Sequence, residues 1–230
     1  MKRVKSSIKE FFFKHLPNSA IIVFHHINEK GVLCSNCVLN YEEFCSFVDE
    51  FDRYASLEEV ISSPQKRQIA ITFDDGLEDL YTHAYPLLKD KGIPFTVFIV
   101  PEFVDKEGYI TKEQLQILAS DPLVTIGSHG LTHKTFTSMC EYEMKLEAEK
   151  SKCILEKLTE NKISMIAYSH GLVNQNVIQT VANVYEYGLS VSAEPLNWLT
   201  KKRKYQLPRF NVENDTVTDT CECIKKLVRL

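Results

Sequence analysis

The feature that most constrains the fold is a series of short apolar segments that alternate with longer amphipathic ones. Two of the short segments, residues 69–73 (Ile-Ala-Ile-Thr-Phe) and 124–127 (Val-Thr-Ile-Gly), are almost free of polar side chains. Compact apolar runs of this kind are typical of strands buried on both faces in a parallel sheet. The alternation continues along the chain without a repeat or a Pro/Gly/Ser-rich linker. It predicts one α/β domain whose parallel sheet is closed into a barrel.

The same patterns place the individual elements. Strands are expected over residues 20–27, 69–73, 94–100, 124–128, 163–168, 187–192 and 205–212. Helices are expected after residue 40, over 77–91, from 111, over 138–158, over 174–184 and over 216–229. Capping boxes that begin at Thr111 and Ser138 indicate two of the helix starts.

Polar side chains follow two of the predicted strands. Asp74, Asp75 and a glycine come directly after residues 69–73, and residues 128–133 (Ser-His-Gly-Leu-Thr-His) end the strand at 124–128. Active sites of parallel α/β folds gather at the carboxyl ends of strands, so these side chains are expected to meet. One carboxylate and two imidazoles suit a divalent metal with open positions, which leaves the second carboxylate for proton transfer. Each of the two motifs alone is weak evidence for a metal site, because Asp-Gly is a common turn and two histidines four residues apart also occur by chance.

Composition excludes several classes of protein. A length of 230 residues fits one large domain, and a net charge of −4 argues against a nucleic-acid-binding protein. The apolar runs are too short to cross a bilayer, and we see no secretory signal. We therefore expect a cytoplasmic protein that is soluble or peripheral at the membrane.

The chain has seven cysteines, an odd number with scattered spacing. This usage suits a reducing compartment better than a disulfide framework, and we expect free thiols. A structural zinc shared by Cys34, Cys37, Cys221 and Cys223 is the alternative.

Residues 1–19 are expected to be a separate segment ahead of a catalytic domain at 20–230. Five basic residues alternate at helical spacing with four apolar ones: Lys2, Arg3, Lys5, Lys9 and Lys14 with Val4, Ile8, Phe11 and Phe12. A basic amphipathic helix either packs on its own domain or lies on an anionic membrane surface. We favour packing on the domain, with contact between residues 1–14 and a membrane as the alternative.

Residues 72–76 and 128–133 resemble the first two motifs of the polysaccharide deacetylases, carbohydrate esterase family 4. Further segments resemble later parts of the family pattern: residues 24–26, 94–98, 166–171 and 207–210. The resemblance spans residues 20–212. It implies a distorted (β/α) barrel with about seven parallel strands in a single domain.

The resemblance assigns roles to the polar residues. Asp75, His129 and His133 would hold one divalent metal ion, and Asp74 would be the general base. Zinc is the expected ion, with cobalt, nickel, manganese and iron suited to the same ligands. Because both histidines must be neutral to bind a metal, activity is expected to fall in acid.

The chain departs from the family at three points, one of which is Ser169-His170 in place of the family's Pro-Tyr. Ala167 replaces the arginine that orients the base in many members, and we expect Arg209, from a later strand, to take over its role. The Leu-x-His that supplies a general acid near the C-terminus is missing. His25 and His170 are the candidates to replace that acid.

Two aromatic residues are considered for sugar binding. Trp198 either stacks on a sugar ring or plugs a gap between a loop and the barrel, and the plug is favoured. Tyr168 either lines the pocket or packs in the core.

The expected function is a metal-dependent hydrolysis of the acetamide of an N-acetylated sugar, in a glycan or glycan precursor. The partner is then an N-acetylated sugar, oligosaccharide or polysaccharide, during synthesis of a cell-surface polysaccharide, and not a nucleic acid. Two alternatives remain: another amidase or deformylase on the same scaffold, and a degenerate carbohydrate-binding protein.

Overall fold

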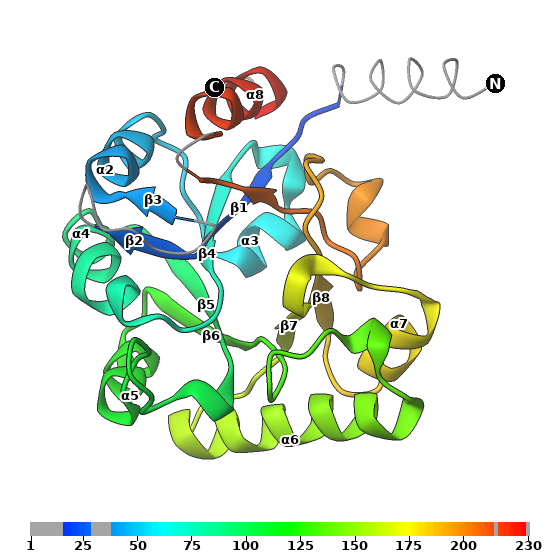
Figure 1. Ribbon diagram of the computed structural model, residues 1–230. Helices are drawn as coiled ribbons and strands as arrows, with labels where there is room; N and C mark the ends of the chain where they lie inside the picture. Colours follow the sequence, from blue (N-terminus) through cyan, green and yellow to red (C-terminus); the bar gives the residue numbers. More distant parts are fainter. Residues whose placement is uncertain (1–15, 29–37, 214–215, 229–230) are drawn as a thin grey trace.

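The computed structural model in Figure 1 describes residues 16–28, 38–213 and 216–228. Seven parallel strands form one sheet in the order β8-β7-β6-β5-β4-β1-β9. Their bounds are β1 Ala20–Phe24, β4 Ile69–Phe73, β5 Phe95–Ile99, β6 Val124–Ser128, β7 Met165–Ala167, β8 Tyr187–Leu189 and β9 Phe210–Asn211. A separate two-stranded parallel sheet contains β2 (His26–Asn28) and β3 (Val38–Asn40). The predicted α/β class and the parallel sheet are confirmed.

One extended segment connects the two edges of the sheet. Its first part, residues 204–209, exchanges backbone hydrogen bonds with β8, as in the bond from the Leu207 N–H to the Gly188 carbonyl (2.9 Å). Its last part is β9, which pairs with β1 in the register Ile22 to Phe210. The sheet therefore curls into a barrel that this segment closes.

Helices surround the strands in Figure 1. The α-helices are α2 Tyr41–Asp49, α3 Leu57–Ser62, α4 Tyr85–Asp90, α5 Lys112–Ser120, α6 Glu141–Thr159, α7 Gln175–Val181 and α8 Val217–Val228. A π-helical turn, Leu80–Ala84, precedes α4. Short 3-10 turns occur at Pro64–Lys66, Pro101–Phe103, Phe136–Ser138, Ser169–Gly171 and Thr200–Lys202.

Alternate residues of each strand belong to two different apolar clusters. In β4, Ile69, Ile71 and Phe73 pack with the large cluster that includes the outer helices, whereas Ala70 belongs to a smaller cluster. The smaller cluster also contains Phe98 of β5 and the apolar residues of α3. Because side chains alternate between the two faces of a strand, the smaller cluster marks the interior of the barrel.

Several predicted boundaries are wrong. The first strand was expected over 20–27, but it ends at Phe24, and His25 separates it from β2. The expected capping box at Ser138 is displaced by two residues. Cys140 is the N-cap of α6, and the Glu143 side chain accepts the Cys140 backbone N–H (2.8 Å). Ser138 instead lies in a 3-10 turn that precedes the helix.

Other boundaries agree more closely. The capping box of Thr111 and Gln114 is present at α5, and Asn174 caps α7 through the backbone N–H of Val177. The expected helix over 77–91 is divided between the π-helical turn and α4. Of the expected strand over 205–212, only β9 has regular pairing with β1.

Some expectations concern residues outside the described part of the chain. These are the amphipathic segment at 1–14 and the pair Cys34 and Cys37. The described cysteines are free: Cys45, Cys140, Cys153, Cys221 and Cys223. Within the described ranges, no helix has the length and apolar character needed to span a membrane.

Candidate active site

Asp74 points into the barrel interior. It follows β4 on the same face as Ala70 and Thr72, as the two-residue period of a strand requires. Arg209 likewise follows Leu207, whose side chain belongs to the interior cluster. The alternation along two separate segments therefore brings a carboxylate and a guanidinium together inside the barrel.

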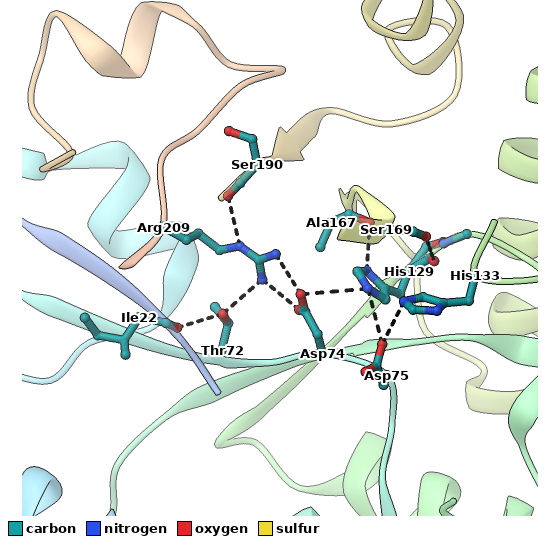
Figure 2. Close-up of polar contacts among 12 residues, drawn as sticks. Ile22, Thr72, Asp74, Asp75, His129, His133, Ala167, Ser169, Ser190 and Arg209 are labelled. Carbon is teal, nitrogen blue, oxygen red and sulfur yellow. Dashed lines mark hydrogen bonds and ion pairs between the residues drawn. The ribbon is translucent and has the colours of Figure 1, made fainter. Parts of the chain in front are cut away.

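Arg209 holds both oxygens of Asp74. Its Nη1 donates to Oδ1 and its Nη2 to Oδ2, each over 2.7 Å (Figure 2). Nη1 also reaches the Thr72 hydroxyl (3.3 Å), and Nε donates to the Ser190 carbonyl (3.3 Å). The guanidinium lies 5.5 Å from the ring centroid of Phe98, in a cation–π contact. A two-pronged, fully buried pair of this kind fixes the carboxylate in one orientation.

The charge state of Asp74 follows from this pairing. Burial alone would raise the pKa of Asp74, but the charge of Arg209 and the neighbouring His129 lower it below the usual range. Asp74 is therefore an anion at neutral pH, although it is almost inaccessible to solvent.

Asp75 points away from Asp74, toward two imidazoles at the rim of the barrel (Figure 2). Its Oδ1 lies 3.1 Å from Nε2 of His133 and 3.4 Å from Nε2 of His129. Nevertheless, this oxygen is buried and has no hydrogen-bond partner among the described residues. Asp74 stays apart from this group, with Oδ2 at 3.8 Å from Nε2 of His129.

These three residues fit a divalent metal ion. Atoms that bind one ion at about 2.0–2.2 Å lie roughly 3–3.5 Å from each other, which agrees with both distances to Oδ1 of Asp75. The three ligand atoms all lie within 4.8 Å of one another. An oxygen without a donor, faced by two nitrogens, is the arrangement that a shared cation would satisfy.

His129 has the tautomer that a metal ligand needs. Its Nδ1 donates to the backbone carbonyl of Ala167 (2.9 Å), which leaves the lone pair of Nε2 directed at the site. Burial lowers the pKa of His129, so the ring is neutral. At the expected arginine position, Ala167 thus contributes a backbone acceptor in place of a cation.

His133 and Asp75 shift each other in opposite directions. The Asp75 carboxylate raises the pKa of His133. Burial would raise the pKa of Asp75, but His133 and His129 hold it well below its usual range. A proton on His133 and a metal ion therefore compete for the same nitrogen.

Glu147 of α6 holds the loop that carries both histidines, and we did not identify it from the sequence. Its Oε1 accepts hydrogen bonds from the backbone N–H groups of Leu131 (2.8 Å) and Thr132 (2.6 Å) and from the Thr132 hydroxyl (2.9 Å). Gly130 packs against the same oxygen. Its φ is +80°, and an added Cβ would lie 3.2 Å from Oε1. The sequence signal was a carboxylate on the apolar face of α6, next to Ala148.

Three site residues have left-handed backbone conformations. The φ values of Asp75, His133 and His170 are +72°, +64° and +60°. Such conformations cost non-glycine residues on the order of 1–3 kcal/mol each and gather at functional sites. Next to His170, the Ser169 hydroxyl donates to the His129 carbonyl (3.0 Å) and so links two of these segments.

The two candidate general acids lie near the cluster in different surroundings. The His170 ring is exposed, with its centroid 4.8 Å from that of His133. His25 follows β1, and its buried Nδ1 has no hydrogen-bond partner among the described residues. Burial, Arg209 and His129 have the larger effects on the pKa of Asp74, and burial, His133 and His129 on that of Asp75. His25 adds a smaller lowering effect to each.

The two aromatic candidates lie outside the cluster. Tyr168 is fully buried, and its hydroxyl donates to the Tyr205 carbonyl (2.9 Å), so it is a packing residue. The favoured interpretation of Trp198 as a plug is wrong, because the side chain is 52% exposed. It lies two residues after Leu196, which pairs with Ser19 at the amino end of β1. Asp75, His129 and His133 lie at the opposite, carboxyl ends of the strands.

Comparisons with known proteins agree with this geometry. The sequence profile described as polysaccharide deacetylase matches residues 62–188. The Bacillus subtilis (strain 168) protein YxkH, named after the same family, is 28% identical over 149 residues, which make up 65% of this chain and 53% of that protein. The poly-beta-1,6-N-acetyl-D-glucosamine N-deacetylase of Staphylococcus aureus (strain MSSA476) is 28% identical over 166 residues, covering 65% of this chain and 56% of the relative. The chain thus spans about half the length of these curated relatives.

The fold has solved counterparts. A crystal structure of a polysaccharide deacetylase from Bacillus cereus superposes with a TM-score of 0.80 at 19% identity, over 90% of this chain and 69% of that one. This likeness confirms the predicted barrel fold. Because the family profile also covers more than half of the sequence, the chain belongs to the polysaccharide deacetylase family.

Proposed function

We propose that this chain is a metal-dependent hydrolase that removes the acetyl group from an N-acetylated sugar of a glycan. The proposal rests on the different surroundings of the two adjacent carboxylates, Asp74 and Asp75. Asp75 faces two imidazoles with an unpaired oxygen, whereas Arg209 keeps Asp74 apart and ionised. Hydrolysis of an amide at a metal centre needs these two groups together.

Asp75, His129 and His133 would hold the ion, and we propose zinc. Two imidazoles and one carboxylate match zinc, while cobalt, nickel, manganese and iron accept the same donors. A divalent ion of this kind supplies a Lewis acid and lowers the pKa of water toward neutrality.

Asp74 takes the proton of the attacking water. As a buried anion it has no competing solvent contact, and the paired guanidinium keeps its carboxylate in one orientation. Arg209 is thus a positioning residue, and Ser190 and Thr72 fix it in turn. A general base so held contributes about 10²–10⁴-fold to the rate.

The departing amine needs a proton, and either His170 or His25 would supply it. His170 is the more accessible, and its ring is tilted by 48° to the His133 ring with the centroids 4.8 Å apart. His25 has a buried Nδ1 without a hydrogen-bond partner among the described residues. The pH–rate profiles of His170→Ala and His25→Ala decide between them, because the variant that loses the alkaline limb identifies the acid. Loss in neither excludes both.

The substrate proposal rests on the relatives. The Staphylococcus aureus relative is named for poly-beta-1,6-N-acetyl-D-glucosamine, and we propose an N-acetylglucosamine-containing polymer or its precursor for this chain. A role in making a cell-surface polysaccharide follows from that substrate.

The direct test is acetate release from β-1,6- and β-1,4-linked N-acetylglucosamine oligomers after loading with zinc. We expect release by the wild type and a loss of about 10²–10⁴-fold in Asp74→Asn at unchanged zinc content. Release from formamides or other amides, but not from these sugars, would favour another amidase. Failure to retain any divalent ion, together with oligomer binding without acetate release, would favour a carbohydrate-binding protein.

A further inference from the structure

Two aromatic side chains lie beside the metal cluster, on a segment to which the proposed function assigns no role. This segment connects β5 to α5, and β5 ends at the same edge of the sheet as β4 and β6, which precede the metal ligands. We define the aromatic pair as Phe103 and Tyr109, whose ring centroids are 4.7 Å apart with the planes at 50°. The Phe103 centroid is also 6.0 Å from that of His133, so the pair adjoins a metal ligand.

Backbone hydrogen bonds fix this segment to both loops that supply the metal ligands. The Ile110 N–H donates to the Gly76 carbonyl (3.0 Å), one residue after Asp75. The Glu102 N–H donates to the Leu131 carbonyl (3.3 Å), between the two histidine ligands. The aromatic pair lies between these two anchors in the sequence and is therefore held in a fixed position relative to the metal cluster.

The core of the protein does not account for the two rings. Val104 and Ile110, which follow them directly, pack into the large apolar cluster. Within the described ranges, neither Phe103 nor Tyr109 belongs to this cluster or to the one inside the barrel. Both rings are partly exposed, and residues 105–108 between them are exposed. Aromatic side chains that stay outside a core and border a site are typical of ligand-binding surfaces.

Hydrogen-bond donors accompany the rings. The Tyr109 hydroxyl forms no hydrogen bond with another described residue. Burial, and to a smaller extent the Asp75 carboxylate, raise the pKa of Tyr109, so the phenol keeps its proton at neutral pH. The Lys106 side chain is exposed, and its ammonium lies 5.0 Å from the Phe103 ring centroid. The aromatic pair thus offers apolar ring faces with donors at their edge.

We propose that the aromatic pair binds the sugar unit next to the one that loses its acetyl group, so that the substrate is an oligomer or polymer and not a monosaccharide. This assignment rests on the proposed function for the identity of the sugar. A pyranose ring presents C–H groups on its faces and hydroxyls around its edge, which matches aromatic faces edged with donors. Because Phe103 lies beside His133 but outside the ligand set, the pair contacts a neighbouring unit and not the reacting acetamide.

The test measures sugar binding without turnover. In the zinc-loaded Asp74→Asn variant, calorimetry gives the affinities for N-acetylglucosamine and for its β-1,6-linked tetramer. We expect the tetramer to bind at least about tenfold more tightly than the monomer. In the same background, Phe103→Ala with Tyr109→Ala should lower this tetramer-to-monomer ratio by about tenfold. A tetramer that binds no more tightly than the monomer, or a ratio that survives the double change, would overturn the proposal.

Two further variants separate the loss of ring contacts from a disturbed loop. Phe103→Leu with Tyr109→Leu keeps apolar volume but removes the ring faces, and it should lower the ratio at unchanged zinc content. Loss of zinc in this variant would show that the rings only support the metal loops, which would contradict a sugar subsite. Tyr142→Ala is the matched control, because this tyrosine of α6 is 71% exposed. It should keep the original ratio, and an equal fall would rule out a defined subsite.

Acetate release by the wild type tests the proposed function separately. A tetramer preference that depends on the aromatic pair, in a protein that releases no acetate from the tetramer, would contradict the hydrolase and support the subsite. Acetate release from monomer and tetramer at the same kcat/KM, without a tetramer preference in binding, would support the hydrolase and overturn the subsite.

Discussion

Asp74 and Asp75 are neighbours in sequence, yet the protein treats their carboxylates in opposite ways. The Asp74 region is saturated, because Arg209 satisfies both oxygens inside the barrel. The Asp75 region is left incomplete, because a buried oxygen faces two imidazole nitrogens without a hydrogen bond. The contrast teaches that a reactive dyad can come from one turn, when the strand period sends one side chain inward and the next to the rim.

The largest expected effect separates the two carboxylates. Asp75→Asn should abolish tight metal binding and reduce acetate release to the level of the metal-free protein, since it removes a ligand. Asp74→Asn should keep the metal. Metal content after gel filtration, measured on both variants, is the readout. If both variants lost the metal, or both kept it, the contrast between the two regions would be broken.

The pairing of Asp74 with Arg209 is tested by removing the guanidinium. Arg209→Met leaves a buried, uncompensated carboxylate, and we expect a loss of about 3–5 kcal/mol in the free energy of unfolding. The double change Arg209→Met with Asp74→Asn should lose less, because no buried charge remains. Urea unfolding of the four proteins in the cycle gives the comparison. A single variant as stable as the wild type would contradict the pairing.

The Asp75 site depends on the loop that carries His129 and His133, which Glu147 holds in place. Glu147→Leu removes the acceptor of three hydrogen bonds and should weaken metal affinity by about 10–100-fold, as loss of outer contacts to a metal site does. Glu147→Gln retains an oxygen at this position and should recover most of the affinity. Glu149→Leu, on the exposed side of the same helix, is the matched control. Chelator competition measures the affinities, and equal losses in the Glu147→Leu and Glu149→Leu variants would rule out a specific role.

The smallest effect comes from an ordinary acid–imidazole pair near the site. His26 Nδ1 and Asp79 Oδ2 form a hydrogen bond of 2.8 Å, unlike Asp75 and its histidines. The bond to Asp79 raises the pKa of His26, so its stabilisation is complete below about pH 6.5 and disappears as the pH rises through the raised value. For a partly exposed pair we expect about 0.5–1 kcal/mol. The stability difference between wild type and Asp79→Asn, followed across this pH range, should shrink with rising pH. A constant difference would show that His26 does not titrate there.

The sequence predicted the part of the site that lies on regular elements. The apolar runs before Asp74 and His129 located both strand ends, and parallel strands place their carboxyl ends together. Arg209 was placed beside the base by family resemblance, and the alternation of side chains explains the contact. His25 and His170 were named from the sequence as candidates for the general acid. The His170 ring centroid lies 4.8 Å from that of His133, and the roles of both histidines remain predictions.

What the sequence did not reveal depends on tertiary contacts. Glu147 belongs to a highly charged helix, and only its position on the buried stripe distinguishes it from its neighbours. The cap of α6 was misplaced because Ser138 resembles a better N-cap than Cys140, yet the preceding 3-10 turn occupies that serine. Trp198 was misjudged because single tryptophans are usually buried, and its exposure follows from hydrogen bonds of Asn197.

The segment that closes the barrel also carries Arg209. Residues 204–209 exchange backbone hydrogen bonds with β8 and the residues that follow it, and the next two residues pair with β1, so Arg209 lies between the two edges of the sheet. During synthesis, a ribosome-bound chain that ends before this segment would carry its metal ligands but not the partner of its base. The same short segment therefore closes the barrel and supplies the guanidinium that orients Asp74.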